Sequence, residues 1–310
     1  MTQNPPTERA ATTGADKGTA ERLERKPRVR RTQRGLPFLL LLPGGIFLGI
    51  LIAATLMIFR MSFGIKGAEW SVWTIQNYLS LGESLYIRSI LLTLRLAFLS
   101  AVLTVLLGYP VAMFMARIKN ESVRFLVTFI LLLPLFVNLL FQSYGWILIL
   151  SPDGVVNKLL LSLGLTHQPL RLIFTEVGVL MGLVQGGFPL AVLPIASALR
   201  NIPKSLEEAA ATLGANRLSV LWHILFPLSL PGVIAGSLII VAFNASAFVV
   251  PFLLGGRRVP MLGILIRDQM GPLLNWPFAS ANAAVLVVIV LIVLTMYQFL
   301  TARFLRIWRQ

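Results

Sequence analysis

Six apolar runs, each long enough to cross a lipid bilayer, constrain this chain more than any other feature of its sequence. A helix rises about 1.5 Å per residue, so roughly 20 apolar residues span a hydrocarbon layer of about 30 Å. The runs lie at approximately 36–60, 87–116, 124–150, 174–199, 229–254 and 282–304. Hydrophobic residues make up 56% of the 310 positions and charged residues 13%, and a water-soluble fold could not bury so much apolar surface. The sequence therefore predicts an all-α, polytopic membrane protein with six transmembrane helices.

Prolines inside these runs bear on how continuous the helices are. They include Pro110, Pro134, Pro189, Pro194 and Pro251. Neighbouring helices in a membrane can satisfy the backbone groups that a proline leaves free, so we expect kinks rather than breaks. Residues 36–306 are therefore predicted to form one transmembrane domain, and the run at 36–60 is predicted to be a retained first span rather than a cleaved signal peptide.

Residues 1–35 have a different composition from the rest of the chain. They hold nine basic and four acidic residues and no apolar period, which predicts a disordered, basic cytosolic tail. Basic residues concentrate on the cytosolic side of membrane proteins. If the N-terminus is cytosolic, six spans return the C-terminus to the cytosol as well. The cytosolic side then holds nine Lys and Arg residues in the tail and three in each of three further segments, which is 18 of the 27. The net charge of +15 thus predicts a lipid bilayer as partner and no nucleic acid.

The residue types needed for catalysis are scarce in this chain. Cysteine is absent, and His167 and His223 are the two histidines, too few for a transition-metal enzyme. No P-loop sequence G-x-x-x-x-G-K-[ST] occurs, so ATP would have to be hydrolysed on another polypeptide. We expect no enzyme activity, no cofactor and no metal. A membrane enzyme and a channel or signalling subunit that needs no ATPase are the alternatives to a transport subunit.

The connection between the fourth and fifth runs, residues 201–227, holds the most informative pattern. Ser205 and Glu208 form an S-x-x-E pair, which predicts a capping box that starts a helix at Ser205. Gly214 tolerates a positive φ and is expected to end that helix. A second short helix is predicted from about Asn216 to Phe226, with Pro227 marking the return to the membrane.

This connection resembles the EAA loop of permeases in binding-protein-dependent ABC importers. The family pattern is E-A-A, three residues, Gly, nine residues, Ile, one residue and Leu-Pro, and this chain departs from it only by Phe226 in place of Leu. The resemblance implies that the loop docks on a separate ATPase subunit. The residues that it assigns to ATPase coupling are Glu207, Glu208, Ala209, Ala210, Gly214, Ile224 and Pro227.

Further fragments resemble the spermidine/putrescine-type permease subgroup. They lie at 77–81, 107–112, 144–146, 153–157, 251–256 and 275–279. The resemblance implies a permease subunit in the cytoplasmic (inner) membrane that forms half of a solute path. Its implied partners are a second, homologous permease, an ATPase dimer and an external solute-binding protein. A homodimeric pore remains an alternative.

Polar side chains at membrane depth are the candidates for lining that path. They are Asn138, Gln142, Tyr144, Gln185, Asn244 and Ser246, with Arg95 as a further residue. Asn and Gln also join helices to each other, and Arg95 can extend to the outer interface, so these structural roles compete with a path role. A polyamine or related amine is the expected solute, although the spans hold no central acidic residue. A phosphonate, an amino-acid derivative, an inorganic anion or iron remain alternatives.

Overall fold

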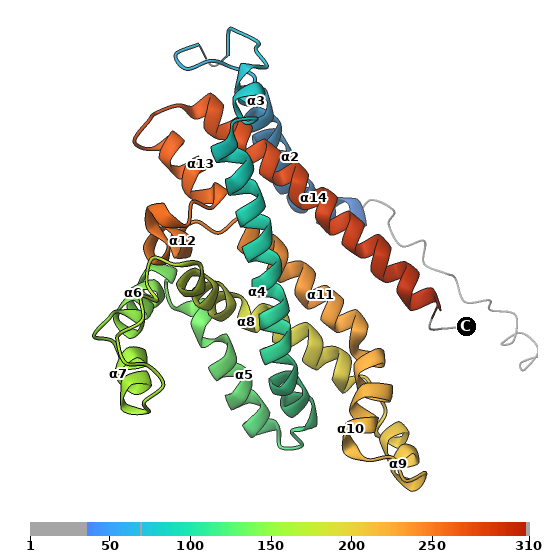
Figure 1. Ribbon diagram of the computed structural model, residues 1–310. Helices are drawn as coiled ribbons and strands as arrows, with labels where there is room; N and C mark the ends of the chain where they lie inside the picture. Colours follow the sequence, from blue (N-terminus) through green and yellow to red (C-terminus); the bar gives the residue numbers. More distant parts are fainter. Residues whose placement is uncertain (1–35, 69, 308–310) are drawn as a thin grey trace, which may run out of the picture. The chain divides into compact units, whose positions relative to one another are not determined.

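The computed structural model describes residues 36–68 and 70–307, with side chains for 42–68 and 70–299. The tail predicted at 1–35 lies outside this part of the chain. The chain divides into two compact units, residues 1–55 and residues 56–310, and the second contains the sites described below. Every regular element in the described residues is helical (Figure 1).

The helices follow one another with short connections. Their bounds are α2 Leu36–Ser62, α3 Gln76–Ser80, α4 Ser84–Arg117, α5 Glu121–Phe136, α6 Leu139–Leu150, α7 Val155–Ser162, α8 Glu176–Arg200, α9 Lys204–Thr212, α10 Arg217–Val220, a π-helical turn Leu221–Leu225, α11 Phe226–Ala245, α12 Val249–Leu254, a 3₁₀ turn Gly256–Arg258, α13 Leu262–Met270 and α14 Trp276–Ile307.

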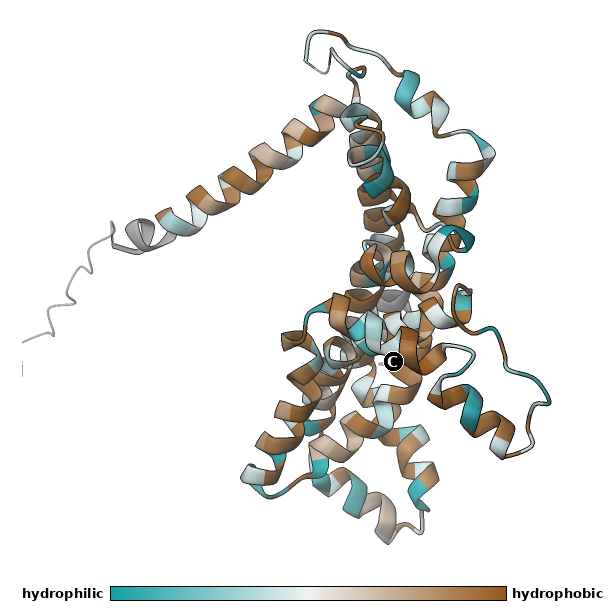
Figure 2. Ribbon diagram, turned by 90° about the vertical axis from the view of Figure 1, so that its left-hand side faces the viewer, coloured by the Kyte–Doolittle hydropathy of each residue, from teal (hydrophilic) through white to brown (hydrophobic). Residues whose placement is uncertain are grey.

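Six helical segments of the described chain are long and apolar enough to cross a membrane. They are Leu42–Ser62, Ser84–Arg117, Leu139–Ser162, Glu176–Arg200, Arg217–Ala245 and Trp276–Phe299. Figure 2 shows apolar residues along these long helices and hydrophilic residues mainly in the connections. The prediction of an all-helical protein with six membrane spans is confirmed.

The third predicted run, 124–150, is not one helix. It is divided into α5 and α6, because Val137 and Asn138 have non-helical ψ angles of 130° and 134°. The Asn138 side chain accepts a hydrogen bond from the amide of Leu140 at 2.8 Å and so caps α6. An asparagine that captures a nearby amide begins a new helix rather than continuing the old one. The expectation of a kink was therefore wrong at this position.

The fifth predicted run, 229–254, is also interrupted. The helix α11 ends at Ala245, and α12 begins at Val249 after three residues of irregular backbone. Pro251 explains where the break lies, because in a continuous helix its ring would clash with the carbonyl of Ala247, four residues earlier. Within α12 the proline occupies the first turn, where its missing N–H is not needed.

The packed centre of residues 56–310 is formed by α4, α8 and α11. Gly232 and Gly236 of α11 allow the backbone of α11 to approach α8 closely. A Cβ added at Gly232 would lie 2.5 Å from the Ala198 Cβ and 2.6 Å from the Pro194 carbonyl oxygen. This G-x-x-x-G spacing is typical of close helix crossings in membranes, where small residues replace the hydrophobic driving force available in water.

Candidate functional site

The connection after α8 begins with α9, which is anchored to α4 by an ion pair. The Arg117 Nη2 lies 2.5 Å from the Glu207 Oε1, and the two side chains are 35% and 21% exposed. Pro203 precedes α9, and no side chain caps its first turn. The predicted capping box of Ser205 and Glu208 was therefore wrong. The helix starts one residue earlier, which places Glu207 rather than Glu208 in its first turn.

Gly214 ends α9 in the way that its residue type predicts. Its φ is +82°, and its amide donates to the Ala211 carbonyl while the amide of Ala215 donates to the Ala210 carbonyl, both at 3.0 Å. This pair of bonds is a Schellman motif, which satisfies carbonyls that the end of a helix would leave free. Gly214 thereby turns the chain sharply between α9 and α10.

The second helix of the connection is longer than the sequence predicts. Asn216 caps α10 by accepting a bond from the Ser219 amide at 2.7 Å. The helix then continues through the π-helical turn into α11 without an end at Phe226. Pro227 lies in the first turn of α11, and because it has no N–H, the wider π turn before it accommodates the missing bond.

One face of the connection packs inward, and the other is exposed. Ala210, Ala215, Leu221 and Ile224 pack against the core of α4, α8 and α11. The exposed side chains include four large apolar ones: Leu206, Leu213, Leu218 and Trp222. Leu213 is 88% exposed. Exposed large apolar side chains in the same connection as the exposed Glu208 and Ala209 are typical of a surface that binds another protein.

A chain of hydrogen bonds joins α5, α6 and α8 near the break between α5 and α6. The Gln142 Nε2 donates to the carbonyls of Pro134 at 2.5 Å and Val137 at 2.7 Å. The Gln185 Nε2 donates to the Gln142 Oε1 at 2.7 Å, and the Trp146 Nε1 donates to the Gln185 Oε1 at 3.2 Å. The Gln142 amide satisfies carbonyl groups that the break between α5 and α6 leaves free. The geometry of Gln142 and Gln185 therefore supports a structural role, in which they hold the three helices together.

Asn244 connects three helices from a fully buried position. It is 0% exposed, and its Nδ2 donates to the Ser100 Oγ at 2.7 Å and the Leu183 carbonyl at 3.3 Å. Because a carbonyl can only accept, the Leu183 contact fixes which end of the amide is the nitrogen. Its Oδ1 has no hydrogen-bond partner among the described residues.

Two other predicted path residues, Tyr144 and Ser246, take no part in the hydrogen bonds of Gln142, Gln185 and Asn244 described above. Tyr144 is exposed, and the Ser246 hydroxyl donates to the Phe243 carbonyl at 2.9 Å.

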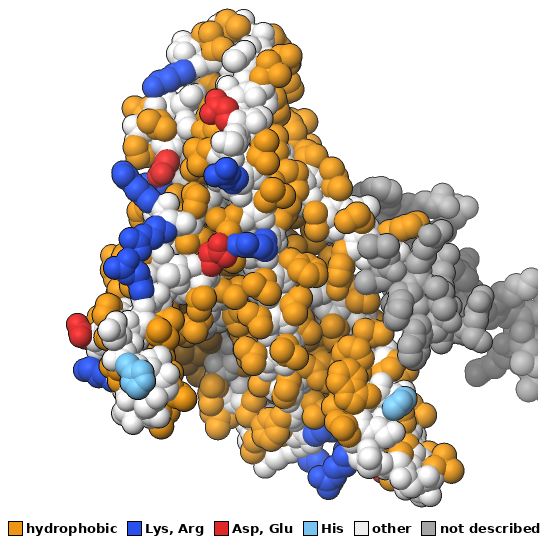
Figure 3. Space-filling view, in the orientation of Figure 1, with side chains coloured by type: hydrophobic (Ala, Val, Ile, Leu, Met, Phe, Trp, Pro, Cys, Tyr) orange, Lys and Arg blue, Asp and Glu red, His pale blue; other side chains and the backbone are white. Residues whose placement is uncertain are grey.

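Arg95 forms an ion pair with Glu176, the first residue of α8. Arg95 lies 22 residues before Arg117 in α4, about 33 Å along a helix, so the two arginines are one hydrocarbon thickness apart. Figure 3 likewise shows basic side chains in the upper left part and at the lower end of one face, with apolar side chains between.

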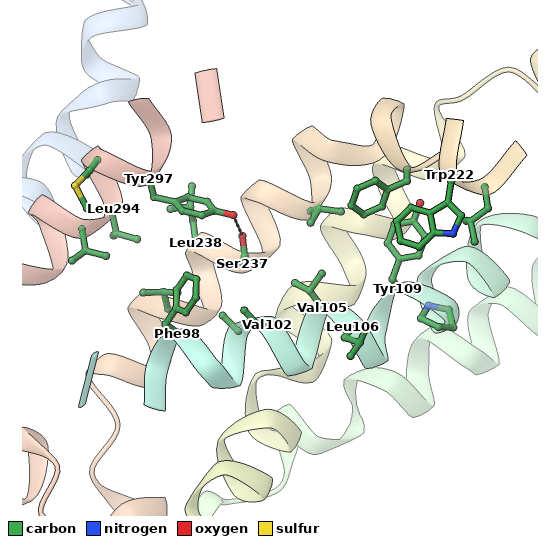
Figure 4. A pocket seen from close by; sticks show the side chains of 18 residues that line it. Phe98, Val102, Val105, Leu106, Tyr109, Trp222, Ser237, Leu238, Leu294 and Tyr297 are labelled. Atoms are coloured by element: carbon green, nitrogen blue, oxygen red, sulfur yellow. Dashed lines mark hydrogen bonds between the residues drawn. The ribbon is translucent and has the colours of Figure 1, made fainter. Parts of the chain in front are cut away.

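Residues 56–310 contain an apolar groove and a smaller cavity at a helix break. A groove of about 780 Å³ is lined almost entirely by apolar side chains of α4, α11 and α14 (Figure 4). Hydrogen bonds at its wall join Tyr297 to Ser237 and Tyr109 to Ser229, each at 3.0 Å. A smaller cavity of about 180 Å³ lies at the break between α11 and α12. No group of three or more His, Cys, Asp or Glu side chains that could hold a metal occurs in the described chain.

The sequence reasoning did not identify two residues that complete these sites. Arg117 holds α9, and Ser100 holds Asn244. Each lies far from its partner in sequence, so spacing gives no signal for either contact. Arg117 follows the predicted run 87–116 and is one of the basic residues that predict which side of the membrane is cytosolic. Its ion pair with Glu207 shows that it also holds α9 in place.

Gln142→Leu is expected to lower the thermal midpoint of the purified protein. The substitution removes the Gln142 bonds to the carbonyls of Pro134 and Val137 and to the Gln185 Nε2. A polar group that loses its partner away from water costs about 1–3 kcal/mol. The measurement is thermal unfolding in detergent. Tyr144→Leu, on the same helix but exposed, is the control and should shift the midpoint little. Equal midpoints for the two variants would contradict the assignment of Gln142 to helix joining.

The comparisons with known proteins agree with each other. A family model described as "Binding-protein-dependent transport system inner membrane component" matches residues 104–306. The spermidine/putrescine transport system permease protein PotB of Escherichia coli (strain K12) is 35% identical over 226 residues, covering 73% of this chain and 82% of PotB. PotB of Haemophilus influenzae is 34% identical over 224 residues, covering 72% and 78% of the two chains.

Solved structures show a similar fold. A chain of a bacterial ABC transporter involved in the import of the acidic polysaccharide alginate has a TM-score of 0.72 at 20% identity, covering 86% of this chain and 95% of its own. A chain of the MetNI methionine ABC transporter has a TM-score of 0.51 at 18% identity, covering 71% and 94%.

Proposed function

The chain belongs to the family of binding-protein-dependent transport system inner membrane components, and we propose that it forms half of the solute path of an ABC importer for polyamines or related small amines. It is a multi-pass permease subunit of the inner membrane and is not itself an ATPase. The observation that supports coupling most directly is the connection from α9 to α10, whose inner face is anchored in the core while its outer face is apolar and exposed.

The residues of this connection divide into three roles in the proposal. Glu208 and Ala209 are exposed on α9 and contact the ATPase, together with Leu213 beside them. Glu207, through Arg117, and Ala210, through the core, hold α9 against the permease. The further residues that set the shape of the connection are Gly214, Ile224 and Pro227. A movement of the ATPase would then be transmitted to α4 and α11 as a rigid-body displacement.

The remaining partners are a second permease, an ATPase dimer and an external solute-binding protein. Large apolar side chains on α5 and α6 support the presence of a second subunit. Several of them are far more exposed than side chains on a helix that is packed on all sides. Phe125, Phe136, Phe141 and Leu148 are all more than 70% exposed. We propose that lipid and a homologous permease cover these faces. Among the proposed path residues, Asn138 caps α6, and Gln142 and Tyr144 lie on it. Gln185 lies on α8, and Asn244 and Ser246 lie at the end of α11.

The proposal of an amine rests on the relatives named for spermidine and putrescine. The residues lining the apolar groove and the cavity at the α11–α12 break include no Asp or Glu, so this chain would handle a cation through weaker acceptors. The test is the affinity of the cognate solute-binding protein for polyamines, amino-acid derivatives, phosphonates, inorganic anions and iron. Tightest binding of putrescine or spermidine is expected, and tightest binding of an anion would overturn the amine assignment.

The proposed orientation places both termini in the cytosol. Because the chain has no native cysteine, single cysteines report topology cleanly. Cysteines at Ser122 and Ser205 are expected to react with an impermeant maleimide only after the membrane is opened. A cysteine at Ser71 is expected to react from outside in intact cells. All three positions are exposed, and labelling of the Ser205 variant from outside would reverse the topology.

A further inference from the structure

The break between α11 and α12 opens a small cavity beside the membrane-spanning helices α8 and α11. It is lined by the end of α11, the three-residue break, the start of α12, and residues of α6 and α8. Its volume of about 180 Å³ exceeds that of a single water, whose share of liquid volume is about 30 Å³. Interrupted helices in transporters commonly expose backbone groups and helix ends toward a transported species.

The cavity wall holds an acceptor without a partner. Asn244 lines the cavity and is fully buried, and its Oδ1 is unpaired among the described residues. Its Nδ2 is committed to Ser100 and Leu183, so the free end of the amide can only accept. A buried unsatisfied acceptor costs free energy unless a donor reaches it, which favours a ligand that brings N–H groups.

The rest of the wall also favours a cation. The end of α11 faces the break, and the C-terminus of a helix has a partial negative charge of about half an elementary charge. The N-terminus of the six-residue helix α12 lies at the same break and offsets part of this charge. Phe243 and Phe248 line the cavity and are 37% and 47% exposed, and an aromatic ring attracts a cation that reaches its face. None of the lining residues is Lys, Arg or His, and the Ser246 hydroxyl already donates to the Phe243 carbonyl.

We propose that this cavity is a transient binding subsite for an alkylammonium group of the transported solute. The proposal rests on the proposed function in so far as it places the subsite on a solute path. The carbonyl oxygen of Asn244, the negative end of α11 and the two phenylalanine rings supply the attraction. The wall contains no carboxylate, so binding is weak, as a path requires if the solute is to leave again.

The chemistry can be tested with a single cysteine. Ser246→Cys places one thiol in the cavity wall of a chain that otherwise lacks cysteine. In the detergent-purified complex, putrescine is expected to slow maleimide labelling of this thiol, while 1,4-butanediol, its neutral analogue, leaves the rate unchanged at equal ionic strength. The labelling rate falls by a factor of one plus the ratio of the ligand concentration to Kd. Putrescine at about ten times Kd therefore slows labelling about tenfold. Equal rates with the diamine and the diol would overturn the proposal.

A control thiol separates occupancy from a general effect of the diamine. Val102→Cys places a thiol in the apolar groove instead, where putrescine is expected to give no protection. If putrescine slows both thiols equally, the effect is not binding at the break, and the proposal fails.

Two further substitutions in the Ser246→Cys background separate the acceptor from helix joining. Asn244→Leu removes the Oδ1 and is expected to abolish the protection by putrescine. Ser100→Ala removes the partner of the Nδ2 at 2.7 Å but leaves the Oδ1 in place, and protection is expected to remain. Loss of protection in the Ser100→Ala variant as well, or its retention in Asn244→Leu, would contradict the role given to the Oδ1.

Failure of this subsite is distinguishable from failure of the proposed function. ATP-driven uptake of putrescine without any protection at Ser246→Cys would refute the subsite and leave the importer assignment intact. Protection by putrescine in a complex whose solute-binding protein prefers another solute would support the ammonium subsite and refute the polyamine assignment.

Discussion

Gly214→Val is expected to reduce ATP-driven uptake by at least an order of magnitude while the protein still reaches the membrane. Gly214 has a φ of +82°, a region that costs an ordinary residue about 1–2 kcal/mol and a β-branched residue more. A Cβ at this position would meet no atom within 4 Å, so the penalty comes from the backbone alone. Relief of the strain would break the two bonds of the Schellman motif and displace α9 from the position in which we propose that it contacts the ATPase.

Gly214→Asn is the matched control, because asparagine tolerates the left-handed region better than other residues do. It should retain most uptake and most bound ATPase. The measurements are uptake, recovery of the ATPase in a pull-down, and the amount of permease in the membrane. Wild-type uptake and full ATPase recovery in the Gly214→Val complex would mean that the shape of this connection does not matter for coupling.

Gly232→Leu is expected to prevent stable folding of the permease. The added Cβ would meet the Pro194 carbonyl oxygen at 2.6 Å and the Ala198 Cβ at 2.5 Å, and backbone atoms cannot move aside as a flexible side chain can. The helices α8 and α11 must then separate. Overpacking of a core costs about 1–3 kcal/mol and occasionally more, and the larger value applies where two backbones are in contact.

The measurement is the yield and trypsin resistance of the purified chain. Gly145→Leu is the control, because a Cβ at Gly145 of α6 meets no atom of the described chain within 4 Å. Its yield should stay close to that of the wild type. Equal yields and equal resistance for the two leucine variants would show that the crossing of α8 and α11 is not close enough to require glycine.

The membrane-spanning helices were predictable because bilayer thickness fixes the length of an apolar run. The two breaks were not, because apolar character continues through them. Asn138 and Pro251 each allow either a kink or a new helix, and the choice depends on whether tertiary partners satisfy the freed backbone groups. At the first break the partner is Gln142, which donates to the carbonyls on the α5 side.

The site was predictable only as far as local sequence determines it. The turn at Gly214 follows from the glycine, and Asn216 is a regular cap. The capping box failed because Pro203 starts α9 one residue early, which shifts the first-turn acid to Glu207. The contacts of Gln142 with Gln185 and of Asn244 with Ser100 join residues 43 and 144 positions apart, and the sequence of one chain does not indicate such pairs.

The most direct test of the central claim, that this permease is coupled to a separate ATPase, is ATP hydrolysis and uptake in proteoliposomes. The reconstituted complex would receive the solute-binding protein outside and ATP inside, with the solute that this protein binds most tightly. We expect uptake only when ATP and the loaded solute-binding protein are both present, with hydrolysis stimulated by the loaded protein. Uptake that continues without ATP, at the rate seen with it, would contradict the account and identify the chain as a channel.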